Sequence, residues 1–568
     1  MGQRLSRLFD QSTTSLHSSP ALLTDGEKAG RGEGLLIVII MSVLAWAPLL
    51  HPGFIQSQSG LAAIYDALSV RSPLTGWLPA YGTPGDGPLA TWLLVILKAV
   101  MTPLGALKLL YALGFALSSV GMFLLAGRLW GNWPGVVAAV VYMLAPYHLS
   151  AAYGRGALAE SLILAGAPFL FLFLDDAVHT TRWRTRPLVG LTSAGLVLLN
   201  FGLGVLFVAL GLVWTAAACF GAAPVLPDVE GSQERRYLTA LTAAVIGIAA
   251  ALLVLWPGGG RFLANMPGWR EHFVYFFQLF SPGWGFGVSS PGWQDEMSFQ
   301  LGLAPLGLAI VALWGAHETS DARYRHNVVV LVILACVTAL LVLTIAAPLW
   351  QIVPLAALLA YPWQLLAPTI LLLALLAGGA AAWVAGQGEA HELGDDAADR
   401  PAGSLVALAV LLAAAVVASY PYLAPRFVDA ADLPTLNHPP IARLGDTILL
   451  LEARYDGQGR PGGTVHLTLI WQAVRRPPAD YTIFAQLFDA AGTKRGQQDM
   501  RPHNGDKPTN TWPAGEIVRD DLTIAVADDA PPGDYTLKIG LYLLATMERL
   551  PVADSDQREV VLAPIKIR

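Results

Sequence analysis

The sequence predicts a polytopic α-helical membrane protein that ends in an extracytoplasmic, all-β sandwich. Of its 568 residues, 54% are hydrophobic and only 13% are charged, whereas a soluble domain carries about 25% charge. Before residue 421, eleven apolar segments approach the length that crosses a hydrocarbon core of ~30 Å. From about residue 445, short runs of alternating apolar and polar residues replace them, separated by Gly/Pro turns.

The first residues are predicted to form a disordered cytoplasmic N-terminus, because residues 1–33 are polar and Ser-rich. Their basic residues are Arg4, Arg7, Lys28 and Arg31. The apolar run 35–50 has no small-residue cleavage site after it, so it is predicted to be a first spanning helix and not a signal peptide. A net charge of -6, with no basic patch interleaved with aromatics, argues against a nucleic-acid partner.

A transmembrane domain is predicted over residues 34–425. Its apolar segments are 35–50, 104–129, 134–149, 160–174, 187–199, 203–221, 238–256, 300–315, 328–347, 364–384 and 405–420. Two further pieces, 89–101 and 349–359, are short and flanked by Pro, so they are either spans or partly inserted helices. The expected count is therefore about 11–13 transmembrane helices.

The positive-inside rule gives the predicted orientation. The basic loops are 182–186, the pair Arg235 and Arg236, and the loop that holds Arg323 and Arg325. They share the cytoplasmic side with the N-terminus only if segment 89–101 does not cross. Loops 51–87 and 257–299 then face outside, and their Gly, Pro and Trp content is typical of segments that lie along the membrane surface. The expected location is the cell (cytoplasmic) membrane.

A polar break interrupts the apolar helices between Pro146 and Glu160. It is Gly-rich and carries Arg155 and Glu160. Such charges usually line a water-filled cavity or a substrate site, and irregular backbone at membrane depth must be buried in protein or face such a cavity. In a continuous helix the two side chains would point ~140° apart, so we expect no simple ion pair on one face. The alternative is a buried structural pair.

The C-terminal region is predicted to be a linker, 426–444, followed by a β-sandwich, 445–568. The alternating runs are 464–471, 481–488, 522–526 and 535–542. The sandwich would be a structural cover, since aromatic residues in a sandwich usually belong to the core. The alternative is glycan binding through an exposed Trp512 or through the loop 499–506.

Several motifs resemble the GT-C superfamily of integral-membrane glycosyltransferases. They are WLPAYGTPGDGPLATWLL, GRLWG, AAVVYMLAPYHLSAAYGRGALAES, SFQLGLAPLGL and AYPWQLLAP, in that order. The chain looks like a bacterial polytopic group that carries a 6-pyruvoyl-tetrahydropterin-synthase-related name, over roughly residues 35–565. The resemblance implies that the protein, surrounded by membrane lipid, transfers a sugar from a polyprenyl-phosphate carrier to an extracytoplasmic lipid, glycan or protein.

The resemblance also implies the site residues. Its catalytic carboxylates would be Glu160, Asp86 and Asp295, and its substrate-binding residues Arg155, Tyr147, His148, His272, Trp363 and Gln364. Asp86 stands where related transferases carry a residue thought to bind a divalent metal, so it is also the candidate ligand for Mg or Mn. Arginine suits a carrier phosphate because its guanidinium matches phosphate geometry.

Each candidate has a plainer reading. Asp86 would be a turn former before Gly-Pro, and Asp66 a solvated loop residue. Asp295 would cap a helix that begins near Ser298. His148 would be a packed interfacial histidine, and Trp363 and Gln364 would be packing residues.

The first outer loop departs from the family pattern. Residues 54–60, where related enzymes carry a carboxylate that acts as general base, contain no Asp or Glu. The alternative is therefore a catalytically degenerate GT-C-fold protein that serves as a structural or glycan-binding subunit of a membrane complex. Whether the chain is an enzyme stays open between these two readings. A transporter is a weaker third, because no inverted repeat of broken helices is visible.

Overall fold

The computed structural model describes most of the chain. The described residues are 25–70, 81, 85–180, 184–221, 232–257, 263, 269–281, 283, 285, 289, 292–293, 295, 297–352, 355–392, 402–553 and 555–568. The predicted disorder of residues 1–33 falls on residues 1–24, outside this part, while residues 25–33 already belong to the first helix.

The membrane domain is a bundle of apolar helices, most of them long. They are α2 (Asp25–Trp46), α5 (Pro103–Trp130), α6 (Asn132–Met143), α7 (Pro146–Leu149), α8 (Leu158–His179), α9 (Thr185–Leu199), α10 (Phe201–Gly221), α11 (Ser232–Leu255), α12 (Leu303–Glu318), α13 (Ala322–Val342), α16 (Leu366–Glu392) and α17 (Ala402–Ser419). Each of the eleven predicted segments lies on one or more of them. Within the described residues, 8 helices are long and apolar enough to cross a membrane, or up to 9 if the bent pair Asn132–Met143 and Pro146–Gly154 is one span.

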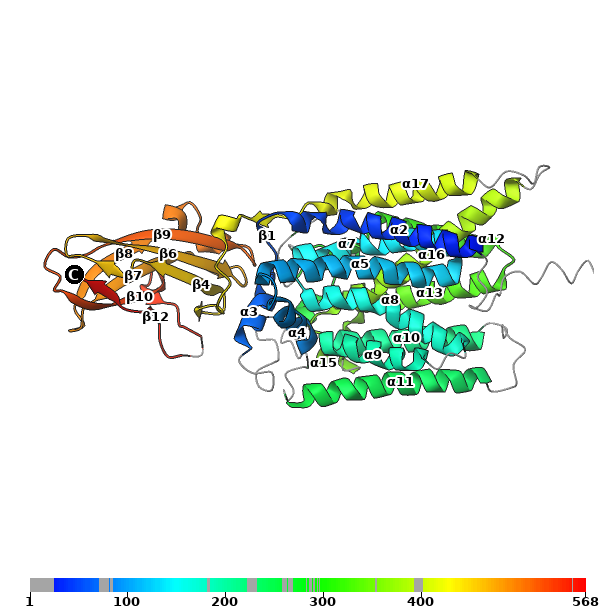
Figure 1. Ribbon diagram of the computed structural model, residues 1–568, viewed down its shortest axis with the longest axis horizontal. Coiled ribbons are helices and arrows are strands. Elements are labelled where there is room, and N and C mark those ends of the chain that lie inside the picture. Colours follow the sequence, from blue (N-terminus) through cyan, green and yellow to red (C-terminus); the bar gives the residue numbers. More distant parts are fainter. Residues whose placement is uncertain are drawn as a thin grey trace, which may run out of the picture.

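The two short apolar pieces do not add spans. Helix α4 (Pro88–Leu97) has 10 residues, which at 1.5 Å per residue is about half of the hydrocarbon thickness. Segment 349–359 falls on α14 (Ala347–Ile352) and α15 (Leu355–Leu358), which are shorter still. Figure 1 shows α4 beside α3 (Ala62–Ser69), at the end of the bundle that carries the β domain.

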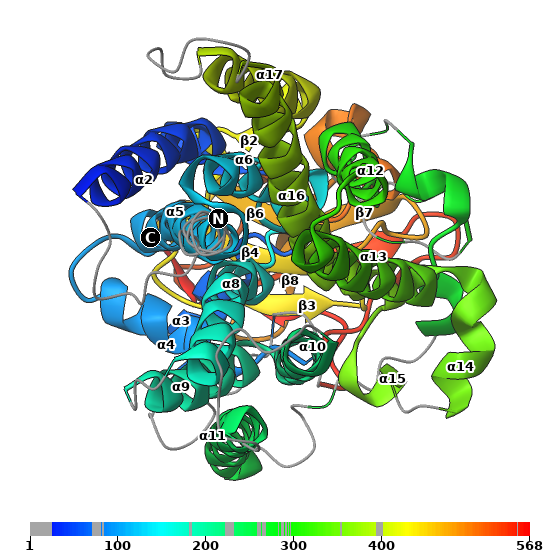
Figure 2. The same ribbon diagram turned by 90° about the vertical axis from the view of Figure 1, so that its right-hand side faces the viewer.

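Helix α16 is the centre of the bundle. Its span is Pro362–Gly386, and 94% of the most apolar 18-residue stretch of this span is buried inside the protein. Figure 2, which looks along the bundle, shows α16 between α6, α12 and α13. The indole of Trp130 donates a hydrogen bond to the Leu375 carbonyl at 2.9 Å and thereby ties α5 to this central helix.

The β domain is a sandwich of two sheets. One has four strands in the order β3 (Ala442–Leu444), β4 (Ile448–Tyr455), β6 (Thr464–Ala473) and β9 (Ile517–Ala525). The other contains β5 (Gln458–Gly459), β13 (Ile565–Ile567), β10 (Gly533–Leu543), β7 (Tyr481–Phe488) and β8 (Lys494–Met500), with β11 (Glu548–Arg549) and β12 (Val560–Val561) also paired to β10. Trp512 is fully buried in the core between the sheets, as expected of an aromatic residue in a sandwich, so the alternative that needs it exposed is wrong.

The sandwich is packed against one end of the helix bundle. The outer face of the four-stranded sheet contributes Leu449, Leu451, Ile470 and Ile517 to the hydrophobic core of the membrane domain. The predicted linker contains β2 (Phe427–Val428), which pairs with β1 (Phe54–Ile55) of the first loop. We call this end of the bundle the sandwich end. Helices α9, α11 and α13 begin at the opposite end, near Arg186, Arg235 and Arg323, and we call it the basic end.

Candidate functional site

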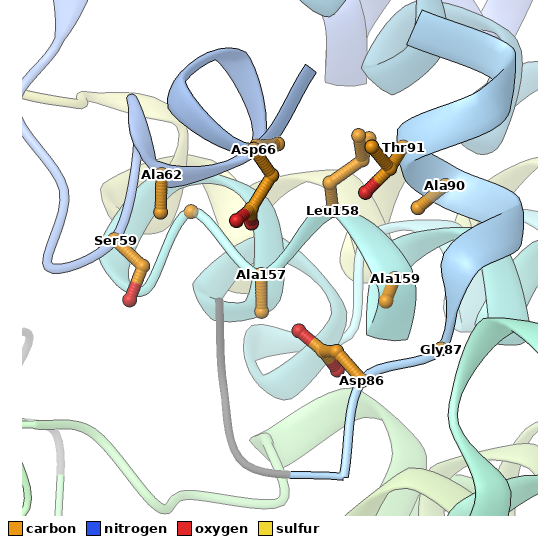
Figure 3. A pocket seen from close by; sticks show the side chains of 12 residues that line it. Ser59, Ala62, Asp66, Asp86, Gly87, Ala90, Thr91, Ala157, Leu158 and Ala159 are labelled. Carbon is orange, nitrogen blue, oxygen red and sulfur yellow. The ribbon is translucent and has the colours of Figure 1, made fainter. Parts of the chain in front are cut away.

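A pocket lies at the sandwich end of the bundle. Helix α3, the N-terminus of α4 and residues 156–159 before and within α8 form its walls. Its polar lining includes Ser59, Asp66, Asp86 and Thr91. Figure 3 shows the carboxylates of Asp66 and Asp86 both directed toward Ala157, which lies between them. Two acidic side chains from the first loop therefore line one small pocket.

The first loop reaches this pocket through close backbone contacts. The amide of Gln58 donates to the Gly154 carbonyl at 3.1 Å, and that of Ser59 donates to the Arg155 carbonyl at 2.8 Å. Gly156 has φ +65°, and a Cβ at this position would lie 2.6 Å from the Gly60 Cα. Only glycine fits this approach, because it tolerates positive φ and has no side chain.

Asp66 is a buried pocket residue and not a solvated loop residue as the sequence suggests. It is only 5% exposed, and its Oδ1 accepts a hydrogen bond from the Tyr81 amide at 2.9 Å. The short helix α3 turns it inward, with Ile64 and Tyr65 buried beside it. The sequence suggests a solvated residue because an amphipathic helix of only 8 residues, about two turns, gives too short a pattern inside a long loop.

Asp86 is held by the turn between α9 and α10. The side-chain Nδ2 of Asn200 donates to the Asp86 Oδ1 at 3.1 Å, and the backbone amide of Gly87 donates to the Leu199 carbonyl at 2.7 Å. A Cβ on Gly87 would lie 2.2 Å from the Leu198 carbonyl oxygen, so this approach also requires glycine. Asn200 thus belongs to the site. The sequence analysis names only Asp86, which is far from Asn200 in the sequence.

Arg155 and Glu160 form a buried ion pair, which agrees with the alternative of a structural pair and not with the divergent side chains of a continuous helix. Arg155 Nη2 lies 2.8 Å from Glu160 Oε1, and Nη1 contacts the other oxygen. The Tyr147 hydroxyl donates to the same Oε1 at 2.6 Å. The pair can form because residues 150–154 are a π-helical turn and α8 begins only at Leu158, so no continuous helix separates the two residues. Neither side chain lines the pocket itself, although residues 156–159 between them do.

Two aromatic rings enclose the Arg155 guanidinium. Its Cζ lies 4.9 Å from the centroid of Tyr147 and 4.7 Å from that of Trp363, distances at which cations are attracted to ring faces. Gln364 fixes the turn that carries Trp363, since its Oε1 accepts from the Tyr361 amide at 3.1 Å. In the described part of the chain, Arg155 Nε and Trp363 Nε1 are buried without a hydrogen-bond partner.

His148 lies outside the pocket lining. Its ring stacks on Phe115 at 5.3 Å, meets Tyr142 edge-on at 5.1 Å, and places Nδ1 3.1 Å from the Tyr142 carbonyl oxygen. The imidazole is 1% exposed. These contacts match the packing role that the sequence offered as its plainer reading.

Asp295 and His272 lie together in the second long loop. Asp295 Oδ2 accepts from Gln278 Nε2 at 2.9 Å, and His272 Nδ1 lies 2.9 Å from the Ser289 hydroxyl. Burial lowers the pKa of His272, and the charges of Asp295 and Glu271 oppose this effect. The capping role predicted for Asp295 is wrong, because α12 begins at Leu303 with Gly302 at its N-cap. Neither residue lines the pocket.

The pocket offers few ligands for a metal ion. Its oxygen donors are the two carboxylates and the hydroxyls of Ser59 and Thr91. Across the described residues, no group of three or more His, Cys, Asp or Glu side chains is placed to hold an ion. An ion at Asp86 would therefore depend on water or substrate for most of its coordination.

Several solved structures align with large parts of this chain at low identity. The Archaeoglobus fulgidus oligosaccharyltransferase tethered to an acceptor peptide is 14% identical, with TM-score 0.41, over 72% of this chain and 55% of that chain. ArnT from Cupriavidus metallidurans bound to undecaprenyl phosphate is 15% identical, with TM-score 0.41, over 70% and 66%. The arabinosyltransferase EmbB from Mycobacterium smegmatis is 11% identical, with TM-score 0.36, over 98% and 67%.

These likenesses are too distant to assign an activity, and the chain spans only 55% of the archaeal enzyme. No protein of curated function matches. A family model described as "6-pyruvoyl-tetrahydropterin synthase related domain; membrane protein" matches residues 87–425, which is more than half of the chain. The chain is thus a polytopic helical membrane protein with a C-terminal β domain, and it belongs to the family of membrane proteins with a 6-pyruvoyl-tetrahydropterin synthase related domain.

Proposed function

We propose that the protein is a membrane glycosyltransferase that passes a sugar from a polyprenyl-phosphate carrier to an extracytoplasmic acceptor. The observation that carries this proposal is the pair Asp66 and Asp86, which line one pocket. Asp66 supplies the first-loop carboxylate that residues 54–60 lack. As general base, it would take the proton of the acceptor hydroxyl, a role that contributes typically about 10²–10⁴-fold to rate.

Asp86 is the proposed ligand of a divalent ion. Mg²⁺ commonly binds through one or two carboxylates, several waters and substrate phosphates, and a site with Asp86 as its one carboxylate ligand fits that pattern. A bound ion would neutralise charge on the departing carrier phosphate. Asn200 orients Asp86 toward the pocket, and the Arg155–Glu160 pair stabilises the break that forms one wall. Asp295 and His272 are proposed to contact substrate from the second long loop.

The sandwich end is proposed to face the outside of the cytoplasmic membrane. Arg186, Arg235 and Arg323 stand at the opposite end, and arginines near span termini favour the cytoplasmic side. The N-terminus of α2 belongs to that basic end as well. The pocket then opens where a carrier lipid presents its sugar to the exterior.

The test is transfer by the full-length protein in liposomes supplied with polyprenyl-phosphate sugars. Asp66→Asn and Asp86→Asn are each expected to lower transfer roughly 100-fold or more. Asp446→Asn is the matched control, because Asp446 is an exposed carboxylate of the sandwich whose side chain is 83% accessible. Full activity in both pocket variants would exclude this site, and a wild type inactive on every carrier sugar would contradict the function.

A noncatalytic role is the second candidate. The observation that favours it is that residues 54–60 carry no carboxylate and that the amides of Gln58 and Ser59 are engaged by the break. Such a protein would be a structural or glycan-binding subunit of a membrane complex. Purification with a stoichiometric partner and without carrier lipid, read by mass spectrometry, would support this candidate over the enzyme.

A further inference from the structure

The first loop is held from two sides within the membrane domain and its linker. On one side, the Gln56 amide donates to the Arg426 carbonyl at 2.8 Å, continuing the pairing of β1 with β2. On the other side, the amides of Gln58 and Ser59 bind the carbonyls of the polar break. Ser59 is itself a pocket residue. Any further contact with residues 56–59 therefore affects the position of Ser59 in the pocket.

A third contact comes from the sandwich, at Gly515. This residue has φ +82°, and a Cβ on it would lie 2.0 Å from the Ser57 carbonyl oxygen and 3.0 Å from the Gln58 Cα. The backbone of the Gly515 turn thus rests directly on the backbone of the first loop. Any side chain at this position would push the two apart, since no flexible group can move aside.

The Gly515 turn is rigid within the sandwich. The Gly515 amide donates to the Ala473 carbonyl at 2.7 Å, and the Ala473 amide donates to the Glu516 carbonyl at 3.0 Å. Three residues earlier, Trp512 is fully buried and donates through Nε1 to the Lys507 carbonyl at 3.0 Å. A turn fixed in this way transmits the position of the sandwich to the loop.

The sandwich also acts electrostatically on the helix that carries Asp66. Tyr65 precedes it in α3, is 2% exposed, and has a hydroxyl without a hydrogen-bond partner among the described residues. Burial raises the pKa of Tyr65 well above its ordinary value, and the charges of Tyr81 and Glu452 raise it further. Glu452 belongs to β4, so a strand of the sandwich lies within electrostatic reach of α3.

We propose that the sandwich is a positioning element of the pocket, and that the Gly515 turn seats Ser57 and Gln58 so that Ser59 and Asp66 reach their places. Gly515 is a positioning residue in this scheme and does not touch substrate. The kinetic part of the proposal rests on the proposed transferase function, whereas its structural part does not.

The structural part is tested by hydrogen–deuterium exchange on the full-length protein in nanodiscs. Gly515→Ala is expected to speed exchange of the amides in residues 57–60 roughly tenfold or more, because the added methyl group lifts the loop from the break. Gly492→Ala is the matched control. Gly492 has φ +79°, so it meets the same backbone strain, but nothing lies within 4 Å of its Cβ. Unchanged exchange of residues 57–60 in Gly515→Ala would overturn the proposal.

The kinetic part is tested by sugar transfer with the same two variants. Gly515→Ala is expected to lower kcat with little change in the KM for the carrier, and Gly492→Ala to change neither. An inactive wild type would contradict the transferase function and leave the exchange result to decide the proposal. If Gly515→Ala does not accumulate, the proposal is tested instead by hydrogen exchange of the wild-type protein at increasing denaturant concentration. Residues 57–60 and 512–516 should then lose protection together, and separate opening would contradict the coupling.

Discussion

Arg155 and Glu160 neutralise each other where neither charge is hydrated. Each residue is at most 5% exposed, and the loss of one partner of a buried pair typically costs about 3–5 kcal/mol because the other charge stays buried. Arg155→Met should therefore lower the thermal midpoint of the detergent-solubilised protein strongly. The double variant Arg155→Met with Glu160→Leu should recover much of the loss. A double variant as unstable as the single one would show that packing, and not charge, is responsible.

Asp520 is an acidic residue that faces the interior of the sandwich. Its Oδ1 accepts from the His503 amide at 2.7 Å, and its Oδ2 has no hydrogen-bond partner among the described residues. Burial raises the pKa of Asp520 above its ordinary value. The folded state therefore binds this proton more tightly than the unfolded state, so the associated stability is present at low pH and is lost as pH rises through the folded pKa.

Asp520→Asn removes this ionisation. We expect the variant to unfold at a higher temperature than the wild type near neutral pH, and the difference to vanish on acidification below the unfolded pKa. Hydrogen exchange of the β9 amides, recorded as a function of temperature, measures this difference in unfolding temperature. Asp534→Asn, at an exposed position, should show no such pH-dependent gain. A gain that persists at low pH would mean that charge is not its cause.

At the scale of elements, the positions of the apolar helices are predictable from the sequence, because the hydrocarbon core requires long apolar runs. The predicted count of about 11–13 spans is higher than the 8, or up to 9, described helices that are long and apolar enough to cross. The polar elements cannot be predicted in this way. A π-helical turn at 150–154 brings Arg155 and Glu160 together, and no periodicity announces it. The short α3 turns Asp66 inward for a similarly local reason. Sequence reasoning therefore finds the break and Asp86, but it does not place Asp66 in the same pocket.

Helix α4 decides the topology, because the basic loops share one side only if it does not cross. Cysteines at Pro52 and Met101, before and after α4, should both react with an impermeant maleimide on intact cells, as should one at Ser555 in the sandwich. The background would carry Cys219→Ala and Cys336→Ala. A cysteine at Ala322, on the basic end, should react only after permeabilisation. Labelling of Pro52 and Met101 from opposite sides would show that α4 spans the membrane.

At the scale of the whole molecule, the four-stranded sheet is buried on its inner face and also on the part of its outer face that meets the membrane domain. In β4, Ile448 and Leu450 join the sandwich core, while Leu449 and Leu451 join the core of the membrane domain. This explains why the run ILLL does not alternate, as a strand with one solvated face would. The sequence predicts a sandwich from its alternating strands, whereas β4, which supplies Leu449 and Leu451 to the docked face, lacks alternation.

Because the outer face of the four-stranded sheet packs on the membrane domain, a charge placed in that interface should detach the sandwich from the helix bundle. Ile470 and His466 lie on the same face of β6, four residues apart, but Ile470 is fully buried against the membrane domain and His466 is exposed. Ile470→Glu removes an apolar contact of about 1.5–3 kcal/mol and places a charge in the interface. We expect limited proteolysis within residues 426–444 to accelerate while the sandwich strands stay resistant. His466→Glu adds the same charge on the same strand and should leave cleavage at the wild-type rate. Equal cleavage of both variants, or digestion of the strands themselves, would mean that the sandwich is not held by this face.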